Sequence, residues 1–239
     1  GPITTFSNYS IVSENRCFLI PKKFPIKKSV IFGCAVPTGV GIVTNEIEPK
    51  KNNTICVIGI GGVGLSALMA CKKLNLKKVL VIDIDKKKLN IAKKLGFKKN
   101  ILMKNKKKSM SKILDFTNGK YFDYTIESTG RSKSIEYAFS ITRKFGGKCF
   151  FATHPNNKSN INLNPFDLIS GKNIKGSWGG SCKPDEDIPF LANLYEKGMM
   201  PLEKLVTKKY RLDEINIALD DLKNSNVFRP LLLIDETLN

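Results

Sequence analysis

Closely spaced glycines carry the strongest chemical signal in this sequence. Gly59, Gly61 and Gly64 form a G-x-G-x-x-G pattern that follows an apolar run and precedes a helix-like segment. Gly59 suits a tight turn, Gly61 lets the backbone approach a pyrophosphate, and Gly64 lets the helix pack closely on the strand. The first N–H groups and the positive dipole end of a helix over 63–74 would then face the phosphates. The pattern predicts a dinucleotide site; the alternative is a glycine-rich turn without a ligand.

An acidic residue stands at the end of the next apolar run. Asp83 comes 19 residues after Gly64, a spacing typical of the carboxylate that accepts the ribose hydroxyls of an adenosine. The same charge repels a 2′-phosphate and favours NAD over NADP, although the lysines at 86–88 oppose this effect. The alternative role for Asp83 is to cap a helix over 86–95. The glycines nearby favour the ligand role.

A methyltransferase is the nearest non-redox alternative, because it also uses a glycine-rich first turn. Its pattern usually carries an acidic residue at the end of the strand, just before the first glycine. Val57 and Ile58 occupy that place here. We therefore discount a methyltransferase.

Apolar runs alternate with helix-like segments from about Pro37 onward. The expected strands are Ile55–Gly59, Val79–Asp83, Asn100–Met103, Tyr124–Ser128, Cys149–Thr153 and Ile174–Trp178. The expected helices are Val63–Leu74, Lys86–Leu95, Ser109–Phe116, Ser132–Phe145 and Pro165–Gly171. Strands joined by crossovers of helical length predict an α/β fold, a doubly wound six-stranded parallel sheet of the Rossmann type.

The two flanks differ from this repeating centre. Residues 1–35 contain a short strand pattern over Tyr9–Val12. Residues 178–239 contain two amphipathic helices and strand patterns near 205–210 and 231–234. We expect residues 36–177 to form the dinucleotide-binding domain and both flanks to be parts of a second, β-rich domain.

Composition excludes several classes of protein. The 239 residues are 41% hydrophobic and 26% charged, so a packed core is available. No apolar run approaches the roughly 18 residues that span a bilayer, and we expect no membrane association. The first residues lack the basic and apolar regions of a secretory signal. Six cysteines without a C-x-x-C pair indicate a reduced, cytoplasmic protein.

Charge invites a different interpretation. Lys and Arg number 40 against 21 Asp and Glu, a formal net charge of +19, which is compatible with nucleic-acid binding. The lysines, however, occur in scattered twos and threes, without interleaved aromatic residues and without helix-turn-helix or zinc-finger spacing. This distribution indicates a solvated basic surface, and we expect no nucleic-acid partner.

Five segments carry motifs in an ordered series: Phe32–Gly41, Gly59–Ser66, Asp83–Lys86, Gly171–Gly180 and Phe228–Leu231. Together they resemble the medium-chain zinc-dependent alcohol dehydrogenases, especially the class that includes glutathione-dependent formaldehyde dehydrogenase. The resemblance runs through nearly the whole chain. It implies that the central domain binds NAD and that the flanks belong to the catalytic domain of the family, most of whose N-terminal part this sequence lacks.

The resemblance also assigns roles to residues around the coenzyme. It implies a pyrophosphate loop, a ribose carboxylate, a lysine beside the ribose and an arginine that neutralises the pyrophosphate. These residues are Gly59, Gly61, Gly62, Val63 and Gly64, then Asp83, Lys88 and Arg229. In the catalytic site, Thr38 matches a threonine that packs near the nicotinamide ring. Three further positions match backbone groups that contact the carboxamide: Phe151, Thr153 and Trp178.

Cys34 matches a ligand of the catalytic zinc of the family. The other zinc ligands of the family are absent from this sequence, and catalytic zinc needs three protein ligands. We therefore expect Cys34 to be an unliganded thiol here and zinc to be bound only in the intact enzyme. His154, the only histidine, is interpreted as a residue at the edge of the nicotinamide pocket.

Three functions are compatible with these features. The first is the coenzyme-binding part of a zinc-type NAD-dependent alcohol dehydrogenase, which transfers hydride between an alcohol or aldehyde and NAD. The second is a natively truncated, non-catalytic nucleotide-binding module. The third, a zinc-free quinone-reductase relative, is disfavoured by Cys34. We also expect a homodimer joined through the sixth strand, because an edge strand offers unpaired N–H and C=O groups.

Overall fold

The computed structural model describes residues 5–22 and 24–235, with the backbone alone at 106–108. The chain divides into two compact units. The sheet unit comprises Cys34–Cys182, and the flanking unit comprises Gly1–Gly33 together with Lys183–Asn239. Each unit is described below by itself.

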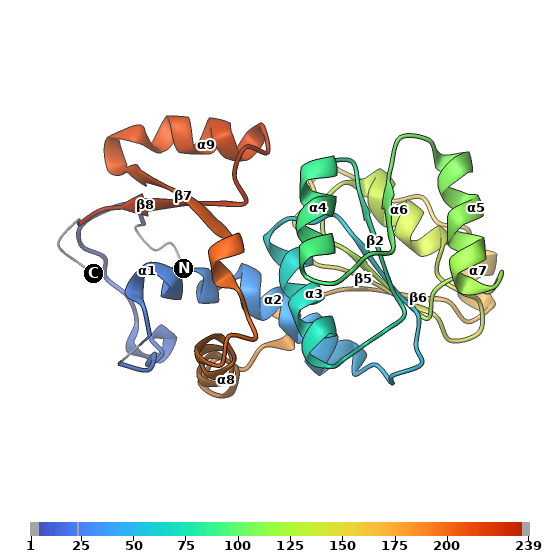
Figure 1. Ribbon diagram of the computed structural model, residues 1–239, viewed down its shortest axis with the longest axis horizontal. Coiled ribbons are helices and arrows are strands. Elements are labelled where there is room, and N and C mark those ends of the chain that lie inside the picture. Colours follow the sequence, from blue (N-terminus) through green and yellow to red (C-terminus); the bar gives the residue numbers. More distant parts are fainter. Residues whose placement is uncertain (1–4, 23, 236–239) are drawn as a thin grey trace. The chain divides into compact units, whose positions relative to one another are not determined.

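The sheet unit is built on six parallel strands (Figure 1). They are β1 (Ile55–Ile58), β2 (Val79–Asp83), β3 (Asn100–Leu102), β4 (Tyr124–Glu127), β5 (Lys148–Phe151) and β6 (Asn173–Gly176). Their order in the sheet is β3-β2-β1-β4-β5-β6. This order consists of two halves that meet between β1 and β4, where the direction of winding reverses. The expected doubly wound Rossmann sheet is confirmed.

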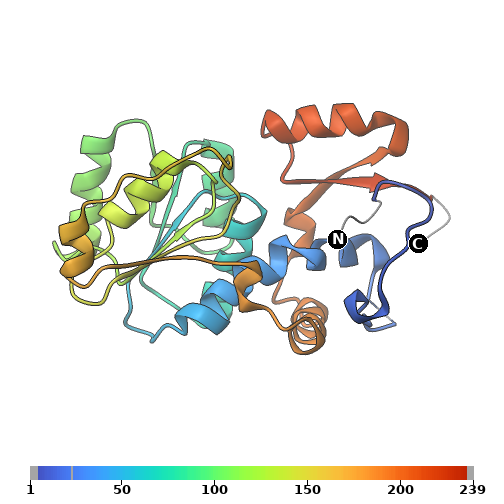
Figure 2. The same cartoon turned by 180° about the vertical axis from the view of Figure 1, so that it is seen from behind.

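Helices cover both faces of this sheet (Figures 1 and 2). They are α3 (Gly62–Lys73), α4 (Lys86–Lys94), α5 (Lys106–Thr117), α6 (Ser132–Ser140) and α7 (Pro165–Ile169). Strand β1 is buried along its whole length, as continuously apolar sequence predicts. Alternate residues such as Cys56 and Ile58 pack on one face with Phe122 and Phe139.

Two further helical segments and a short turn complete the sheet unit. They are α2 (Ala35–Gly41), the π-helix η3 (Ile42–Ile47) and the 3₁₀ turn η4 (Gly179–Ser181). Helix α2 packs on α3 so closely that a Cβ on Gly39 would lie 2.7 Å from Ser66 Cβ and 2.9 Å from the Ala67 nitrogen. The absence of a side chain at Gly39 therefore sets the distance between these two helices.

The flanking unit contains a small parallel pair of strands, β7 (Val206–Arg211) and β8 (Arg229–Leu233), connected through α9 (Ile215–Lys223). Its remaining elements are η1 (Glu14–Arg16), α1 (Ile26–Ser29), η2 (Val30–Gly33), α8 (Pro184–Glu196), η5 (Leu202–Lys204) and η6 (Leu212–Glu214). Phe24 packs against the rings of Phe32 and Tyr195 at centroid distances of 4.9 and 5.1 Å. This contact joins the N-terminal and C-terminal parts of the unit.

Two sequence-based expectations about secondary structure are wrong. Tyr9–Val12 forms no strand, and Ile11 is 96% exposed. An alternating pattern does not make a strand unless another strand pairs with its backbone. The helix expected over 132–145 ends at Ser140, because the chain then turns to make a bridge between Thr142 and Phe122.

No single helix among the described residues is long and apolar enough to cross a membrane. The segments Ile26–Gly33 and Ala35–Ile47 meet the length and composition test only when taken together, as a bent pair. Every residue of α2 is buried inside the sheet unit.

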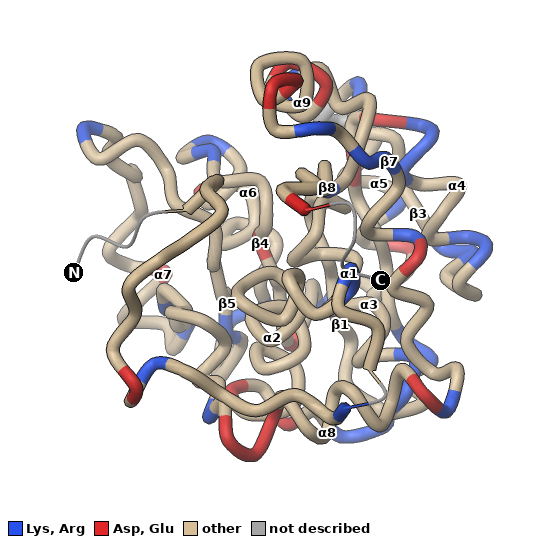
Figure 3. The backbone as a smooth tube through the Cα atoms, turned by 90° about the vertical axis from the view of Figure 1, so that its left-hand side faces the viewer, with Lys and Arg blue, Asp and Glu red and all other residues tan. Residues whose placement is uncertain are grey.

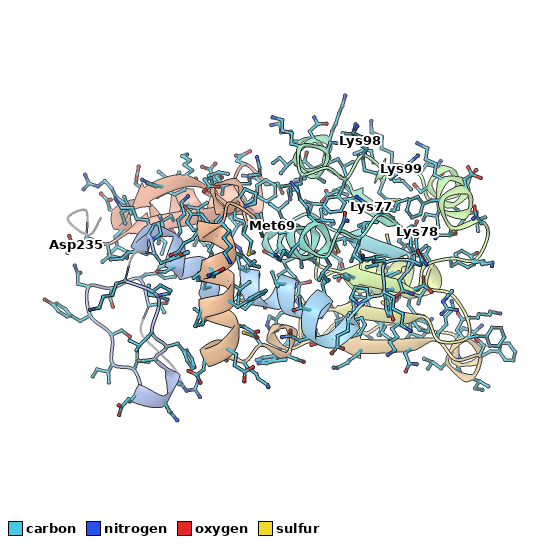
Figure 4. All side chains as sticks on the ribbon, turned by 60° about the horizontal axis from the view of Figure 1, so that its bottom comes forward. Met69, Lys77, Lys78, Lys98, Lys99 and Asp235 are labelled. Atoms are coloured by element: carbon cyan, nitrogen blue, oxygen red, sulfur yellow. The ribbon has the colours of Figure 1, made fainter. Side chains whose placement is uncertain are left out.

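Basic residues are distributed over many elements instead of gathering on one (Figure 3). Within the sheet unit, the side chains of Lys77, Lys78, Lys98 and Lys99 lie together just before β2 and β3 (Figure 4). They are at the amino ends of these strands. The glycine loop follows the carboxyl end of β1, at the opposite edge of the sheet.

Candidate functional site

The glycine loop leaves β1 through a turn that requires glycine. Gly59 has a φ of +85°, and a Cβ there would come 2.5 Å from Thr129 Cγ2. The Gly59 N–H donates to Ile82 O on the neighbouring strand at 2.9 Å. Both a left-handed conformation and a close neighbour therefore exclude a larger residue at this position.

The next glycines shape the start of α3. Gly61 is the N-cap residue and makes no side-chain capping bond, and no described residue lies within 4 Å of a Cβ built on it. At Gly64, by contrast, a Cβ would overlap Gly59 O and lie 2.6 Å from Ser128 Oγ. The first turn of α3 contains no acidic residue. Its N–H groups and dipole thus face an open approach that suits an anion.

Asp83 ends β2 beside this loop and is 7% exposed. Its Oδ2 accepts a hydrogen bond from the Ile60 N–H at 2.6 Å, and its Oδ1 accepts one from the Asp85 N–H at 2.8 Å. The N-cap of α4 is Asp85, which accepts from the Lys87 N–H at 2.7 Å. Asp83 is therefore not the helix cap. Its carboxylate lies at the carboxyl end of β2, and half-buried Lys88 follows in α4.

A second buried carboxylate supports the loop from the other side, and the sequence analysis did not identify it. Glu127 ends β4 and is fully buried. Its Oε1 accepts from both the N–H and the hydroxyl of Thr129, the residue that contacts Gly59. Ser128 donates to Gly59 O. An acidic residue at the end of a predicted strand was the available signal.

Helix α2 brings Thr38 to the same edge of the sheet unit. Thr38 is 4% exposed, and its hydroxyl donates to Cys34 O at 2.7 Å. Gly180 of η4 packs directly on this helix, since a Cβ there would lie 2.5 Å from Thr38 O. The turn after β6 and the helix that carries Thr38 therefore form one packed region.

The other residues expected at the nicotinamide end follow β5 and β6. The ring of Trp178, 84% exposed, makes an edge contact with the His154 ring at a centroid distance of 5.2 Å. Thr153 Oγ1 is buried, has no hydrogen-bond partner among the described residues, and would lie 3.2 Å from a Cβ on Gly130. The Phe151 ring packs on Gly176. The tertiary structure thus brings His154, Thr153 and Trp178 to the carboxyl ends of adjacent strands.

The His, Cys, Asp and Glu side chains of the described residues do not form a site that fits a zinc ion. Cys34 is exposed, and no group of three His, Cys, Asp or Glu side chains comes together in the part of the chain that is described. Burial raises the pKa of the Cys71 and Cys149 thiols to about 12, and the thiolate is the form that ligates a metal. Among the described residues, Cys34 is therefore not joined by two further side chains of these types.

Arg229 belongs to the flanking unit. It begins β8 and is half-buried, and its Nε is buried without a hydrogen-bond partner in the part of the flanking unit that is described.

Comparisons with known proteins agree with this architecture. A family model described as zinc-binding dehydrogenase matches residues 62–197. Alcohol dehydrogenase 6 of Peromyscus maniculatus is 31% identical over 229 residues, which cover 96% of this chain and 61% of that protein. Alcohol dehydrogenase 2 of Zea mays is 28% identical over 98% of this chain and 62% of its own length.

A solved structure shares the fold over almost the whole chain. Benzyl alcohol dehydrogenase from Acinetobacter calcoaceticus superimposes with a TM-score of 0.87 at 29% identity, covering 95% of this chain and 62% of that one. The chain spans about three fifths of the length of these relatives.

Proposed function

The chain belongs to the zinc-binding dehydrogenase family, and we propose that it is the coenzyme-binding part of an NAD-dependent alcohol dehydrogenase. The observation that carries the proposal is the pairing of an open, uncapped start of α3 with the Asp83 carboxylate at the end of the adjacent strand. The first feature suits a pyrophosphate and the second suits a ribose diol. A glycine-rich turn alone would explain only the first.

Each part of the site has a distinct task toward NAD. The N–H groups of Gly62, Val63 and Gly64 would hold the pyrophosphate, and Gly61 would leave room for its approach. Asp83 would accept the adenosine ribose hydroxyls, with Lys88 beside them. When bound, NAD supplies a nicotinamide carbon that accepts or donates hydride.

The nicotinamide half would lie over β4–β6, because a dinucleotide crosses the point where the winding of the sheet reverses. Thr38 would pack beside the ring, and backbone groups at Phe151, Thr153 and Trp178 would face the carboxamide. The assignment of Arg229 to the pyrophosphate remains a prediction from the sequence resemblance. In the longer relatives the substrate is named as an alcohol, and we propose an alcohol or aldehyde as the substrate class of the intact protein.

Zinc-dependent chemistry is not proposed for this chain by itself, because Cys34 cannot make the three-ligand site that catalytic zinc requires. We propose a cytoplasmic setting, because the six cysteines are far apart in the sequence and form no C-x-x-C pair.

Titration calorimetry with NADH and NADPH tests the proposal. We expect NADH to bind more tightly, since the Asp83 charge repels a 2′-phosphate. Equal or tighter binding of NADPH would remove the assignment of Asp83, and no binding of either coenzyme would overturn the proposed function.

We also propose that two copies of the chain pair through β6. This strand is the last of the six in the sheet, and its residues Asn173, Lys175 and Gly176 are exposed. An unpaired strand edge of this kind favours isologous pairing with a second copy.

A further inference from the structure

A buried carboxylate joins two segments that are distant in sequence. Glu46 lies in the π-helix η3, and its side chain is only 2% exposed. Its Oε1 accepts hydrogen bonds from the hydroxyls of Ser177 and Ser181, both at 2.8 Å. Lys175 Nζ lies 3.5 Å from Oε2. All three partners belong to β6 or to the loop 177–181 that follows it, so one side chain of η3 holds this loop.

The backbone of the loop adopts a conformation that needs such support. Gly179, Gly180 and Ser181 have φ values of +67°, +69° and +51°. A serine rarely adopts the left-handed region, and it persists there when surrounding contacts fix the chain. The Gly180 N–H donates to the Ser177 hydroxyl at 3.2 Å, and this hydroxyl donates to Glu46. A continuous network therefore runs from Glu46 through the turn.

The loop held in this way borders the second half of the proposed coenzyme site. Gly180 packs on the α2 backbone, where a Cβ would lie 2.5 Å from Thr38 O and 2.9 Å from Gly41 Cα. The loop follows the carboxyl end of β6, in the opposite half of the sheet from Asp83. With the adenosine on the Asp83 side, the second nucleotide falls over β4–β6. The loop thus adjoins the nicotinamide end.

We propose that Glu46 is a positioning residue for the nicotinamide half of the coenzyme. It acts through loop 177–181, whose turn it stabilises, and does not contact the pyrophosphate half. This inference rests on the coenzyme-binding function proposed above. Since Oε1 accepts both serine hydroxyls, the amide oxygen of a glutamine can replace it, whereas alanine removes the acceptor.

The fluorescence of Trp178 can report whether Glu46 holds loop 177–181 in place. Trp178 is the only tryptophan of the chain and lies in this loop, 84% exposed. In the ligand-free chain, Glu46→Ala should lower the fluorescence anisotropy of Trp178, and Glu46→Gln should leave it near the wild-type value. Glu48→Gln is the matched control, because it removes the same charge from an exposed side chain two residues away. An unchanged anisotropy in Glu46→Ala would show that Glu46 does not fix the loop.

Binding then tests the positioning role. ADP-ribose carries the adenosine and pyrophosphate of NADH but no nicotinamide. By calorimetry, Glu46→Ala should weaken NADH about tenfold and ADP-ribose about twofold at most, and Glu46→Gln should bind both nearly as wild type does. Equal losses for the two ligands, or no loss for either, would overturn the inference.

Two further measurements separate the possible failures. Thermal unfolding of each variant shows whether it is folded. If Glu46→Ala does not fold, Ser181→Ala replaces it, because this variant removes one of the two hydroxyls. It should lower Trp178 anisotropy and NADH affinity in the same direction but by less. If the wild-type chain binds neither NADH nor ADP-ribose, the proposed function is wrong. The anisotropy of Trp178 still shows whether Glu46 fixes loop 177–181.

Discussion

The Oδ2 oxygen of Asp83 accepts a 2.6 Å hydrogen bond from the backbone N–H of Ile60. This bond joins the end of β2 to the glycine loop, so the carboxylate proposed to bind ribose also fixes the loop proposed to bind pyrophosphate. Ile60 is fully buried, and its N–H needs this acceptor because an unpaired buried donor destabilises the fold. Binding and stability are therefore coupled at Asp83.

Substitution at Asp83 should separate these two contributions. Asp83→Asn keeps one acceptor oxygen but loses the charge and the second acceptor, so NADH affinity should fall about tenfold and the preference over NADPH should shrink. Asp83→Ala should also lower the free energy of unfolding by about 1–3 kcal/mol, since Ile60 loses its acceptor. Calorimetry and urea unfolding measure the two effects. Unchanged NADH binding in Asp83→Ala would contradict the role in ribose binding.

Two glycines of the loop should respond in opposite ways to the same added methyl group. Gly61→Ala should leave the unfolding temperature nearly unchanged, because no described residue lies within 4 Å of its Cβ, but should abolish NADH binding by blocking the pyrophosphate. Gly64→Ala should destabilise the fold by about 1–3 kcal/mol, because its Cβ overlaps Gly59 O. Thermal unfolding and calorimetry on both variants test this. Full NADH affinity in Gly61→Ala would refute the proposed approach of the pyrophosphate.

Asp123 should contribute to the loss of fold stability at low pH. Burial acts to raise the pKa of this carboxyl, but hydrogen bonds from the Thr54 N–H and hydroxyl, together with the Arg143 charge, outweigh it and lower the pKa below its usual value. A lowered pKa stabilises the folded state above the unfolded pKa of about 3.9, and this stabilisation is lost as pH falls through the folded value.

Asp123→Asn should therefore lower the free energy of unfolding by about 1 kcal/mol at neutral pH. The difference from wild type should begin to shrink below about pH 4, where the carboxyl of the unfolded chain takes up a proton, and should shrink further as pH falls through the lower folded-state pKa. Urea unfolding at a series of pH values measures it, and Asp115→Asn, at an exposed position in α5, is the control. A difference that is constant with pH would show that the charge of Asp123 does not contribute.

Pairing through β6 should depend on backbone donors that face away from the sheet. The N–H groups of Asn173 and Ser177 donate to Gly147 O, just before β5, and to Phe151 O at its end. Since inward and outward N–H groups alternate along a strand, the N–H of Ile174 points away from the sheet. Sedimentation should give about twice 26.7 kDa for the wild type, and Ile174→Pro should shift the chain toward monomer by removing this donor. Ile174→Ala controls for lost packing and should remain dimeric. A monomeric wild-type chain at micromolar concentration would refute the proposal.

Spacing along the chain was sufficient to predict the doubly wound sheet, the glycine loop and the position of Asp83. These features are local: a strand, a turn and a helix follow one another, and parallel strands of this kind place their carboxyl ends at one edge. The same local reasoning failed for Tyr9–Val12, because a strand exists only when another segment pairs with it.

The tertiary structure alone decided the supporting contacts. Glu46 and Ser177 are separated by 131 residues, and nothing in either local sequence indicates that η3 and the turn after β6 come together. An acidic residue at a strand end marks Glu127 in the sequence, but its support of the loop beside Gly59 appears only in the fold. The periodicity of the sequence indicates which face of a helix or strand is buried. The partner of a buried polar group depends instead on which distant segments the connections between strands bring together. Hydrogen bonds between distant segments therefore appear only once the fold is known.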